Sequence, residues 1–213
     1  SATGSGKTLA FLLPILENIE EENKNTQALI VVPSRELAMQ IEQVFKTMGT
    51  GNKITACYGG HKREIEENNL VQPPAVIVGT AGRLCDHIRR GNITVDSITT
   101  LVLDEFDKSL ELGFLEEMKF IADSLPNVHK KILTSATDTV EIPDFINLKD
   151  PQKINFLKPG DEKEGLAIKT VFSADKDKSE TLFKLMCYLG NRSTIVFCNH
   201  REAVERTSTL LHE

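Results

Sequence analysis

Five short apolar runs, separated by amphipathic stretches, constrain the fold of this chain more than any other feature of its sequence. They occupy residues 28–32, 54–58, 75–78, 101–103 and 132–133. The first of them is apolar at every position, so a strand formed there would bury both of its faces. Strands of that kind are typical of a parallel sheet with helices on each side. The alternation therefore predicts an α/β fold built on a doubly wound, mostly parallel sheet.

The alternation lapses between Asn147 and Leu166, where Pro, Gly, Lys, Asp and Glu predominate and would break any helix. We therefore expect a first domain at residues 1–149, a linker at residues 150–166 and the start of a second α/β domain at residues 167–213. The second part favours strands at 168–172 and 194–197, and helices at 179–189 and from residue 201 to the chain end. So short a stretch cannot bury a full core, and this second domain is expected to be incomplete.

Charge and composition exclude several classes of protein. A net charge of −6 argues against a protein that coats nucleic acid by bulk electrostatics, so any grip on phosphate must be local. The apolar runs are far shorter than the roughly 18 to 20 residues of a membrane span. Cys57, Cys85, Cys187 and Cys198 form no C-x-x-C pair, and no histidine stands at metal-ligand spacing from them. This cysteine usage favours reduced thiols in a cytoplasmic protein.

The first eight residues match a phosphate-binding loop, except that Ser1 stands where the general pattern has its first Gly. Gly4 and Gly6 allow backbone N–H groups to turn toward phosphates, Lys7 can reach the outer phosphates, and the Thr8 hydroxyl can ligate magnesium. The following helix would add its N-terminal dipole. We therefore predict a nucleotide-binding loop of Ser1, Ala2, Thr3, Gly4, Ser5, Gly6, Lys7 and Thr8.

An apolar strand at residues 101–103 is followed directly by Asp104 and Glu105. In P-loop enzymes the magnesium ligand lies at the carboxyl end of a strand near the loop. Asp104 is therefore predicted to hold the metal with Thr8, and Glu105 to orient or deprotonate the attacking water. Lys7, Asp104 and Glu105 form the predicted catalytic set. Taken alone, an Asp-Glu pair after a strand is often only the solvated start of a helix.

Six motifs in order make this sequence resemble the DEAD-box RNA helicases of superfamily 2. They are the loop at 1–8, Pro-Ser-Arg-Glu-Leu-Ala at 33–38, Gly-Gly at 59–60, Thr-Ala-Gly-Arg-Leu at 80–84, Asp-Glu-Phe-Asp at 104–107 and Ser-Ala-Thr at 135–137. Residues 195–199 resemble the strand that opens the family's second domain. The resemblance implies a RecA-like first domain and the beginning of a second RecA-like domain, in a chain truncated at both ends.

Three positions depart from the family's pattern. Phe106 replaces the Ala of Asp-Glu-Ala-Asp, Ala81 replaces the Pro of Thr-Pro-Gly-Arg, and Ser34 replaces the Thr of the second motif. None of these changes removes a ligand. The bulk of Phe106 is expected to alter only the packing beneath the acidic loop.

The resemblance also implies a set of residues that face RNA phosphates, and the residue types suit that task because they offer close backbone approach, a hydroxyl or a guanidinium fork. Taken singly, each residue is equally consistent with an alternative interpretation, as an ordinary turn glycine or as a structural arginine such as one paired with Glu36. A further set would link the nucleotide state to the RNA face by hydrogen bonds. The RNA set is Arg35, Gly59, Gly60, Thr80, Gly82 and Arg83, and the coupling set is Asp107, Ser135 and Thr137.

The implied function is that of an ATP-dependent RNA helicase. Such an enzyme uses ATP and Mg2+, grips RNA through its backbone without sequence preference, and parts short duplexes when its two domains close. We expect a monomer without membrane association. The family's adenine-reading segment and arginine fingers fall outside this sequence, so these residues alone should bind nucleotide weakly and turn over slowly. Two alternatives stay open: a P-loop ATPase that remodels DNA or protein, and an inactive nucleotide-binding scaffold.

Overall fold

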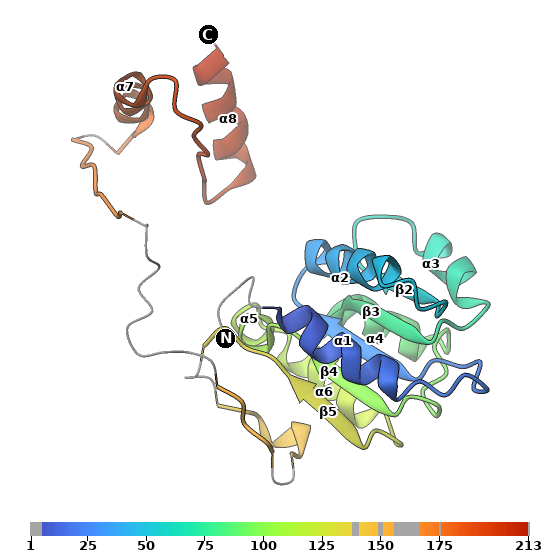
Figure 1. The fold of residues 1–213 in the computed structure, drawn as a ribbon. Coiled ribbons are helices and arrows are strands. Elements are labelled where there is room, and N and C mark those ends of the chain that lie inside the picture. The colour runs from blue at the N-terminus through green and yellow to red at the C-terminus, as the bar shows by residue number, and fades with distance from the viewer. Residues whose placement is uncertain (1–5, 138–140, 149–150, 156–166, 175, 213) are drawn as a thin grey trace. The chain divides into compact units, whose positions relative to one another are not determined.

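The computed structural model of the chain describes residues 6–137, 141–148, 151–155, 167–174 and 176–212 (Figure 1). The chain divides into two compact units, Ser1–Asp161 and Glu162–Glu213. The division falls inside the segment where the sequence favours a linker. Within the described ranges, no helix is both long enough and apolar enough to span a membrane.

A five-stranded sheet forms the centre of the first unit, with the strand order β2-β3-β1-β4-β5 (Figure 1). All neighbouring strands are parallel. The predicted α/β fold with a parallel sheet is therefore confirmed, and each strand lies within a few residues of its predicted position. The strands are β1 Ala28–Val32, β2 Ile54–Cys57, β3 Val76–Thr80, β4 Thr100–Leu103 and β5 Lys130–Leu133.

Two apolar clusters, one on each face of the sheet, bury the central strand β1 completely. Successive side chains of a strand point to opposite faces. Leu29 and Val31 accordingly lie in one cluster, and Ala28, Ile30 and Val32 lie in the other. Because both faces of β1 need cover, its sequence is apolar throughout, and the sheet is doubly wound as predicted.

Helices supply that cover and begin where the sequence provides a start signal. Helix α2, for example, follows Ser34, whose hydroxyl accepts the Leu37 N–H at 3.2 Å as an N-cap. The helices of this unit are α1 Lys7–Glu17, α2 Arg35–Thr47, α3 Arg63–Leu70, α4 Ala81–Arg89, α5 Phe106–Glu111 and α6 Leu115–Asp123, with a short 3-10 turn, η1, at Asp144–Ile146.

The second unit contains the helices α7 Ser179–Leu189 and α8 Arg201–His212, both at their predicted positions. The strands predicted at 168–172 and 194–197 are wrong, because neither segment forms a strand in this structure. A strand exists only through hydrogen bonds to a neighbouring strand, and neither segment pairs with any described residue. Most of their apolar side chains stay exposed, with Phe172 and Phe197 each 89 % accessible.

Candidate functional site

Outside the predicted phosphate-binding loop, the predicted functional residues lie in or just after the loops that follow the five strands. Because all strands of the sheet run parallel, their carboxyl ends meet at one edge, where open α/β sheets bind ligands. The loop after β1 leads to Arg35, the loop after β2 holds Gly59 and Gly60, and β3 ends at Thr80. Asp104 follows β4 directly. The fold therefore collects these residues along a single edge of the sheet.

Asp104 is a buried carboxylate, 3 % exposed, at the end of β4. Its backbone N–H donates to the Val31 carbonyl at 2.9 Å. The Thr134 hydroxyl donates to Asp104 Oδ1 and accepts the Glu105 N–H at 3.1 Å. Burial raises the pKa of Asp104, although the bonds from Thr134 and the Glu105 N–H and the positive charge of Lys7 oppose that rise. A cation at this point would compensate the desolvated charge.

Lys7 lies close enough to Asp104 to favour its ionised form. It is the first residue of α1, and Gly6 before it has a φ of 84°, a left-handed conformation that glycine adopts at no steric cost. Thr8 follows in the same helical turn. Ser1, Ala2, Thr3, Gly4 and Ser5, the remainder of the predicted loop, lie outside the described residues. The structure thus brings together the lysine and the aspartate that the predicted metal–triphosphate site requires.

Glu105 adopts a left-handed backbone, with φ 46° and ψ 49°. For a residue with a Cβ this conformation costs about 1 to 2 kcal/mol. It turns the chain sharply from β4 into α5. Two hydrogen bonds hold the turn: the one from the Glu105 N–H to Thr134, and one from the Phe106 N–H to the Thr134 carbonyl at 3.0 Å. Strained backbone conformations that are held in place by several surrounding contacts occur most often at functional sites.

Asp107 is buried in the first turn of α5 and contacts the segment after β5. Thr137 donates its hydroxyl hydrogen to Asp107 Oδ2 at 3.1 Å. Ser135 in turn accepts the Thr137 N–H at 3.0 Å. Burial acts to raise the pKa of Asp107, but Ser135, Thr137 and the backbone N–H groups of Lys108 and Ala136 stabilise its charge, and the pKa falls below its usual range. Asp107 is thereby joined to the Ser-Ala-Thr segment.

Arg35 and Gly60 approach each other from the loops that follow β1 and β2. A Cβ built on Gly60 would lie 3.2 Å from Arg35 Nη1, and the Gly60 φ of +100° also favours glycine. Arg35 forms an ion pair with Glu36 at 2.6 Å, with both side chains more than half exposed. An exposed pair like this contributes little stability, so Arg35 remains available to a ligand. Gly59 lies beside Gly60 in the same loop.

Thr80, Gly82 and Arg83 lie at the start of α4. Thr80 occupies the N-cap position without a side-chain capping bond, and a Cβ on Gly82 would meet nothing within 4 Å. Arg83 is different, because its side chain is only 15 % exposed and its Nη1 lies 3.5 Å from Glu66 Oε2. Its Nη2 donates to the His61 carbonyl at 3.3 Å. The buried carboxylate of Glu66 thus holds the guanidinium of Arg83 in place.

Sequence reasoning missed two residues that shape this edge, Thr134 and Glu66. Thr134 directly precedes the Ser-Ala-Thr motif, but a lone threonine after a strand carries no signal of a partner 30 positions earlier in the chain. Glu66 shares the buried face of α3 with Leu70, four residues on. A glutamate at a helix position expected to be apolar was the available signal.

A parallel sheet with a buried Asp104 at the end of one strand, within electrostatic range of the lysine at the start of a glycine-capped helix, is the arrangement of a P-loop nucleotide-binding domain. The family model for DEAD/DEAH box helicases matches residues 1–145, and the chain belongs to this family.

Curated relatives and solved structures agree with this family. The ATP-dependent RNA helicase CshA of Limosilactobacillus reuteri is 36 % identical over 210 residues, which cover 97 % of this chain and 42 % of that protein. The ATP-dependent RNA helicase DeaD of Escherichia coli K12 is 39 % identical over 161 residues, covering 71 % of this chain and 25 % of DeaD. The chain therefore spans less than half the length of these relatives.

Two solved structures share the fold. A hypothetical ATP-dependent RNA helicase from Sulfolobus tokodaii superposes with a TM-score of 0.59 at 33 % identity, covering 69 % of this chain and 42 % of that one. The yeast DEAD-box splicing factor Prp28 superposes with a TM-score of 0.60 at 30 % identity, covering 65 % of this chain and 36 % of Prp28. The first unit is accordingly a RecA-like domain of the DEAD-box type.

Proposed function

We propose that the intact protein carrying this chain is an ATP-dependent RNA helicase, which couples ATP binding and hydrolysis to RNA binding and local duplex unwinding. The observation that carries the proposal is the approach of Lys7 to the buried Asp104 at the same sheet edge that presents Arg35 and Arg83. Relatives named ATP-dependent RNA helicases, matched over most of this chain, support it.

The nucleotide half of the proposal assigns roles to residues around β4 and α1. Lys7 neutralises charge on the outer phosphates, and the N-terminus of α1 adds its positive dipole end. Glu105 orients the attacking water and accepts its proton. Its strained backbone is held by the hydrogen bond from the Glu105 N–H to Thr134. Positioning and charge stabilisation of this kind supply most of the rate enhancement in phosphoryl transfer.

Magnesium fits the donor chemistry at the end of β4. Asp104 is a carboxylate whose ionised form is penalised by burial, and Thr8 offers a hydroxyl from the neighbouring helix. Both are hard oxygen ligands, the type that Mg2+ prefers alongside substrate phosphates. Asp104 and Thr8 would hold the ion, and its charge would offset that of the triphosphate.

The RNA half of the proposal places the phosphate backbone on Arg35, Gly59, Gly60, Thr80, Gly82 and Arg83. Gly82 leaves open space above the N-terminus of α4, so a phosphate can approach the helix end and its dipole. Arg35 is exposed beside Gly60. Contacts of this kind carry no base information, and binding should therefore be independent of RNA sequence.

Coupling between nucleotide binding and RNA binding is assigned to Asp107, Ser135 and Thr137. The Thr137–Asp107 hydrogen bond joins the segment after β5 to the helix that follows the acidic pair. A shift of Glu105 during hydrolysis would therefore move Asp107, two residues on, and with it Thr137. We also propose a cytoplasmic location, since all four cysteines are free and free thiols are typical of reducing compartments. We further propose that the protein acts as a monomer.

The decisive experiment measures ATP hydrolysis by the intact protein with and without single-stranded RNA. We expect RNA of any sequence to raise kcat by about tenfold or more, a barrier change of about 1.4 kcal/mol, and single-stranded DNA to have no such effect. A short RNA duplex should separate only when ATP is present. Lys7→Ala should abolish both activities, whereas Lys119→Ala, at an exposed position on α6, should leave them intact.

Other outcomes would support the alternative classes. Hydrolysis that does not respond to RNA but responds to DNA or to a protein substrate would identify a different P-loop remodelling enzyme. If Lys7→Ala left the protein's biological role unchanged, the chain would be a scaffold whose nucleotide site is dispensable.

A further inference from the structure

A buried carboxylate outside the nucleotide site lies directly beneath the proposed RNA face. Glu66 on α3 is 1 % exposed and faces both α4 and the loop that follows β2. Its Oε1 accepts the Tyr58 N–H at 2.8 Å and lies 3.0 Å from His61 Nε2. Its Oε2 lies 2.6 Å from His87 Nε2 and 3.5 Å from Arg83 Nη1. One side chain therefore ties together three segments of the sheet edge.

The contact between His87 and Glu66 has a defined direction. Asn92 Nδ2 lies 3.0 Å from His87 Nδ1 and 3.3 Å from the carboxylate of Glu67, so its amide donates and Nδ1 accepts. His87 then carries its proton on Nε2 and donates it to Glu66. With the imidazole in this neutral form, the charge that offsets Glu66 comes mainly from the guanidinium of Arg83.

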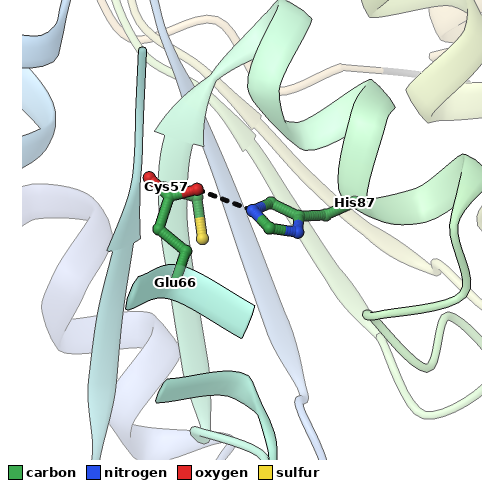
Figure 2. A group of neighbouring side chains, drawn as sticks. All are labelled: Cys57, Glu66 and His87. Atoms are coloured by element: carbon green, nitrogen blue, oxygen red, sulfur yellow. Dashed lines mark hydrogen bonds and ion pairs between the residues drawn. The ribbon is translucent and has the colours of Figure 1, made fainter. Parts of the chain in front are cut away.

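Figure 2 shows Cys57, Glu66 and His87 converging from β2, α3 and α4, a grouping that the spacing of cysteines and histidines in the sequence did not indicate. Their ligand atoms lie within 4.8 Å of one another, which raises the possibility of a metal centre. Two observations oppose it. Burial, together with the negative charge of Glu66, raises the pKa of the Cys57 thiol far above neutrality, and a thiol is a poor metal ligand compared with a thiolate. The cationic Arg83 already occupies Glu66 Oε2.

The network constrains the two proposed phosphate-binding elements at once. Through Tyr58 and His61, Glu66 holds both ends of the loop that contains Gly59 and Gly60. Through its ion pair it orients Arg83, which also donates to the His61 carbonyl. A guanidinium has five N–H donors, so these two contacts leave donors for a phosphate. Arg83 therefore keeps N–H donors for RNA while it is held in place.

We infer that Glu66 is a positioning residue for RNA binding, which holds the 58–61 loop and Arg83 in the arrangement that receives the RNA backbone. The inference rests on the proposed function. A group fixed before binding loses less side-chain entropy when the ligand arrives. Glu66 itself touches no RNA in this scheme, and it takes no part in the nucleotide site.

The test compares Glu66→Gln with Glu64→Gln in the intact protein. Glu64 lies on the same helix but is exposed, so the control removes the same charge without breaking the network. The measurements are the RNA concentration that half-saturates ATPase stimulation, using a single-stranded oligouridine, and the KM for ATP. In Glu66→Gln, half-saturation should rise about tenfold, or about 1.4 kcal/mol, while the KM for ATP and the RNA-saturated kcat stay within twofold. Glu64→Gln should resemble the wild type.

A double-mutant cycle with Arg83→Ala tests whether Glu66 acts through Arg83. Arg83→Ala alone should raise half-saturation, and adding Glu66→Gln should then cost less than it does in the wild-type background. If Glu66→Gln does not fold, Glu66→Asp takes its place with the same expected pattern. Aspartate keeps the charge but withdraws the carboxylate by one methylene group.

The outcomes separate this inference from the proposed function. If Arg83→Ala leaves half-saturation unchanged, the proposed RNA face itself is wrong. If Arg83→Ala weakens RNA binding but neither Glu66 variant does, only the positioning role is wrong. An equal rise in the KM for ATP would indicate general damage to the fold, and a stoichiometric zinc ion in the purified protein would indicate a metal centre. Either result overturns the inference.

Discussion

Asp104 and Asp107 lie three residues apart, yet their surroundings shift their pKa values in opposite directions. Burial raises the pKa of Asp104, so its ionised form is less stable in the folded protein than in the unfolded one. Burial also acts on Asp107, but Ser135, Thr137 and nearby N–H groups outweigh it and lower the pKa. The ionised Asp104 therefore lowers the stability of the folded protein and the ionised Asp107 raises it, as expected if Asp104 serves a ligand and Asp107 joins α5 to the segment after β5.

Asparagine at these two positions should therefore have opposite effects on stability at neutral pH. Without nucleotide or magnesium, Asp104→Asn should raise the melting temperature at pH 7, because the burial that raises the pKa of Asp104 destabilises the folded wild-type protein at pH values above the unfolded pKa of about 3.9. The gain should disappear as the pH falls through that raised pKa toward the unfolded value of about 3.9. Asp107→Asn should lower the melting temperature at pH 7, and this loss should fade as the pH falls below about 3.9, through the lowered pKa.

Thermal unfolding between pH 3 and pH 8 measures both effects in one series. The two variants serve as controls for each other, since each loses one carboxylate charge from the same loop. A destabilised Asp104→Asn protein at pH 7 would contradict the assignment of Asp104 as a carboxylate desolvated for a ligand.

Thr134 should be required for hydrolysis although it contacts no proposed ligand. Thr134→Val keeps the shape but removes the hydroxyl, leaving Asp104 Oδ1 and the Glu105 N–H without their partner. We expect a loss of about 1 to 3 kcal/mol in unfolding free energy and a fall in kcat of about tenfold or more, because Glu105 is no longer fixed. Urea unfolding and steady-state ATPase assays measure the two quantities.

The control for this prediction is Thr47→Val. Thr47 is exposed, and its hydroxyl bonds only to the Val44 carbonyl, so its loss should change neither quantity appreciably. Wild-type kcat in Thr134→Val would mean that Glu105 is held by other contacts.

At the residue scale, the sequence identified the residues that carry charge or phosphate contacts and missed those that hold them. Lys7, Asp104 and Glu105 stand in short local motifs whose chemistry is recognisable without a fold. Glu66 and Thr134 act on partners that are remote in the chain, and the Glu66–His87 contact joins residues 21 positions apart. The Glu66–His87 contact depends on how α3 lies relative to α4, and the Thr134 contacts depend on the pairing of β4 with β5. Local patterns specify neither.

At the scale of elements, β2, β3 and α4 pack closely around Gly79. A Cβ on Gly79 would lie 2.3 Å from the Cys57 carbonyl oxygen and 2.9 Å from Leu84 Cδ2. No side chain fits there, so glycine permits the helix and two strands to meet. Three residues on, Gly82 has open space around it, although both glycines border the same helix.

Alanine substitutions at Gly79 and Gly82 should distinguish a glycine needed for packing from a glycine needed for ligand contact. Gly79→Ala should destabilise the protein by about 1 to 3 kcal/mol or more, since β2 and α4 must move apart. Gly82→Ala should leave stability equal or raise it by up to about 1 kcal/mol, because alanine favours the helix. Under the proposed function, Gly82→Ala should nevertheless weaken RNA binding, because its methyl group enters the space a phosphate would use.

Urea unfolding and RNA titration of both variants measure these effects. If Gly82→Ala bound RNA as well as the wild type, the N-terminus of α4 would not approach the RNA backbone.

The elements of the first unit were predictable because each strand there is a short apolar run between polar turns. Their order across the sheet was not, since β1 pairs with β3 and β4 and no local pattern distinguishes that arrangement from another parallel order. In the second unit the helices were predictable from periodicity. The strand predictions failed there because β-branched residues favour a strand only when a partner strand is present.

At the scale of the whole molecule, the two units differ in how much they bury. The first contains the two apolar clusters. In the second, α7 has no buried residue, and Tyr188 and Phe197 are exposed. A unit without a core contributes little cooperative stability, and exposed apolar groups of this extent promote association.

Removing residues 162–213 should therefore leave the unfolding of the first unit almost unchanged. We expect the truncated chain to melt within about 2 °C of the full 213-residue chain, which corresponds to less than about 1 kcal/mol. It should also bind less of a dye that reports exposed apolar surface. Calorimetry and dye fluorescence at equal concentration test this. A clear drop in melting temperature would mean that the second unit stabilises the first.

The strand order has a consequence for how many anions this edge can accommodate. From β4, which leads to Asp104, to β2, which leads to Gly59, there are three interstrand steps, or about 14 Å. A single phosphate cannot bridge that width. Under the proposed function, the nucleotide near Asp104 and the RNA near Gly59 would therefore occupy separate positions along the edge, and neither would displace the other. Their mutual repulsion would be shielded by the cationic side chains of Lys7 and Arg35, which begin the helices α1 and α2 at this edge.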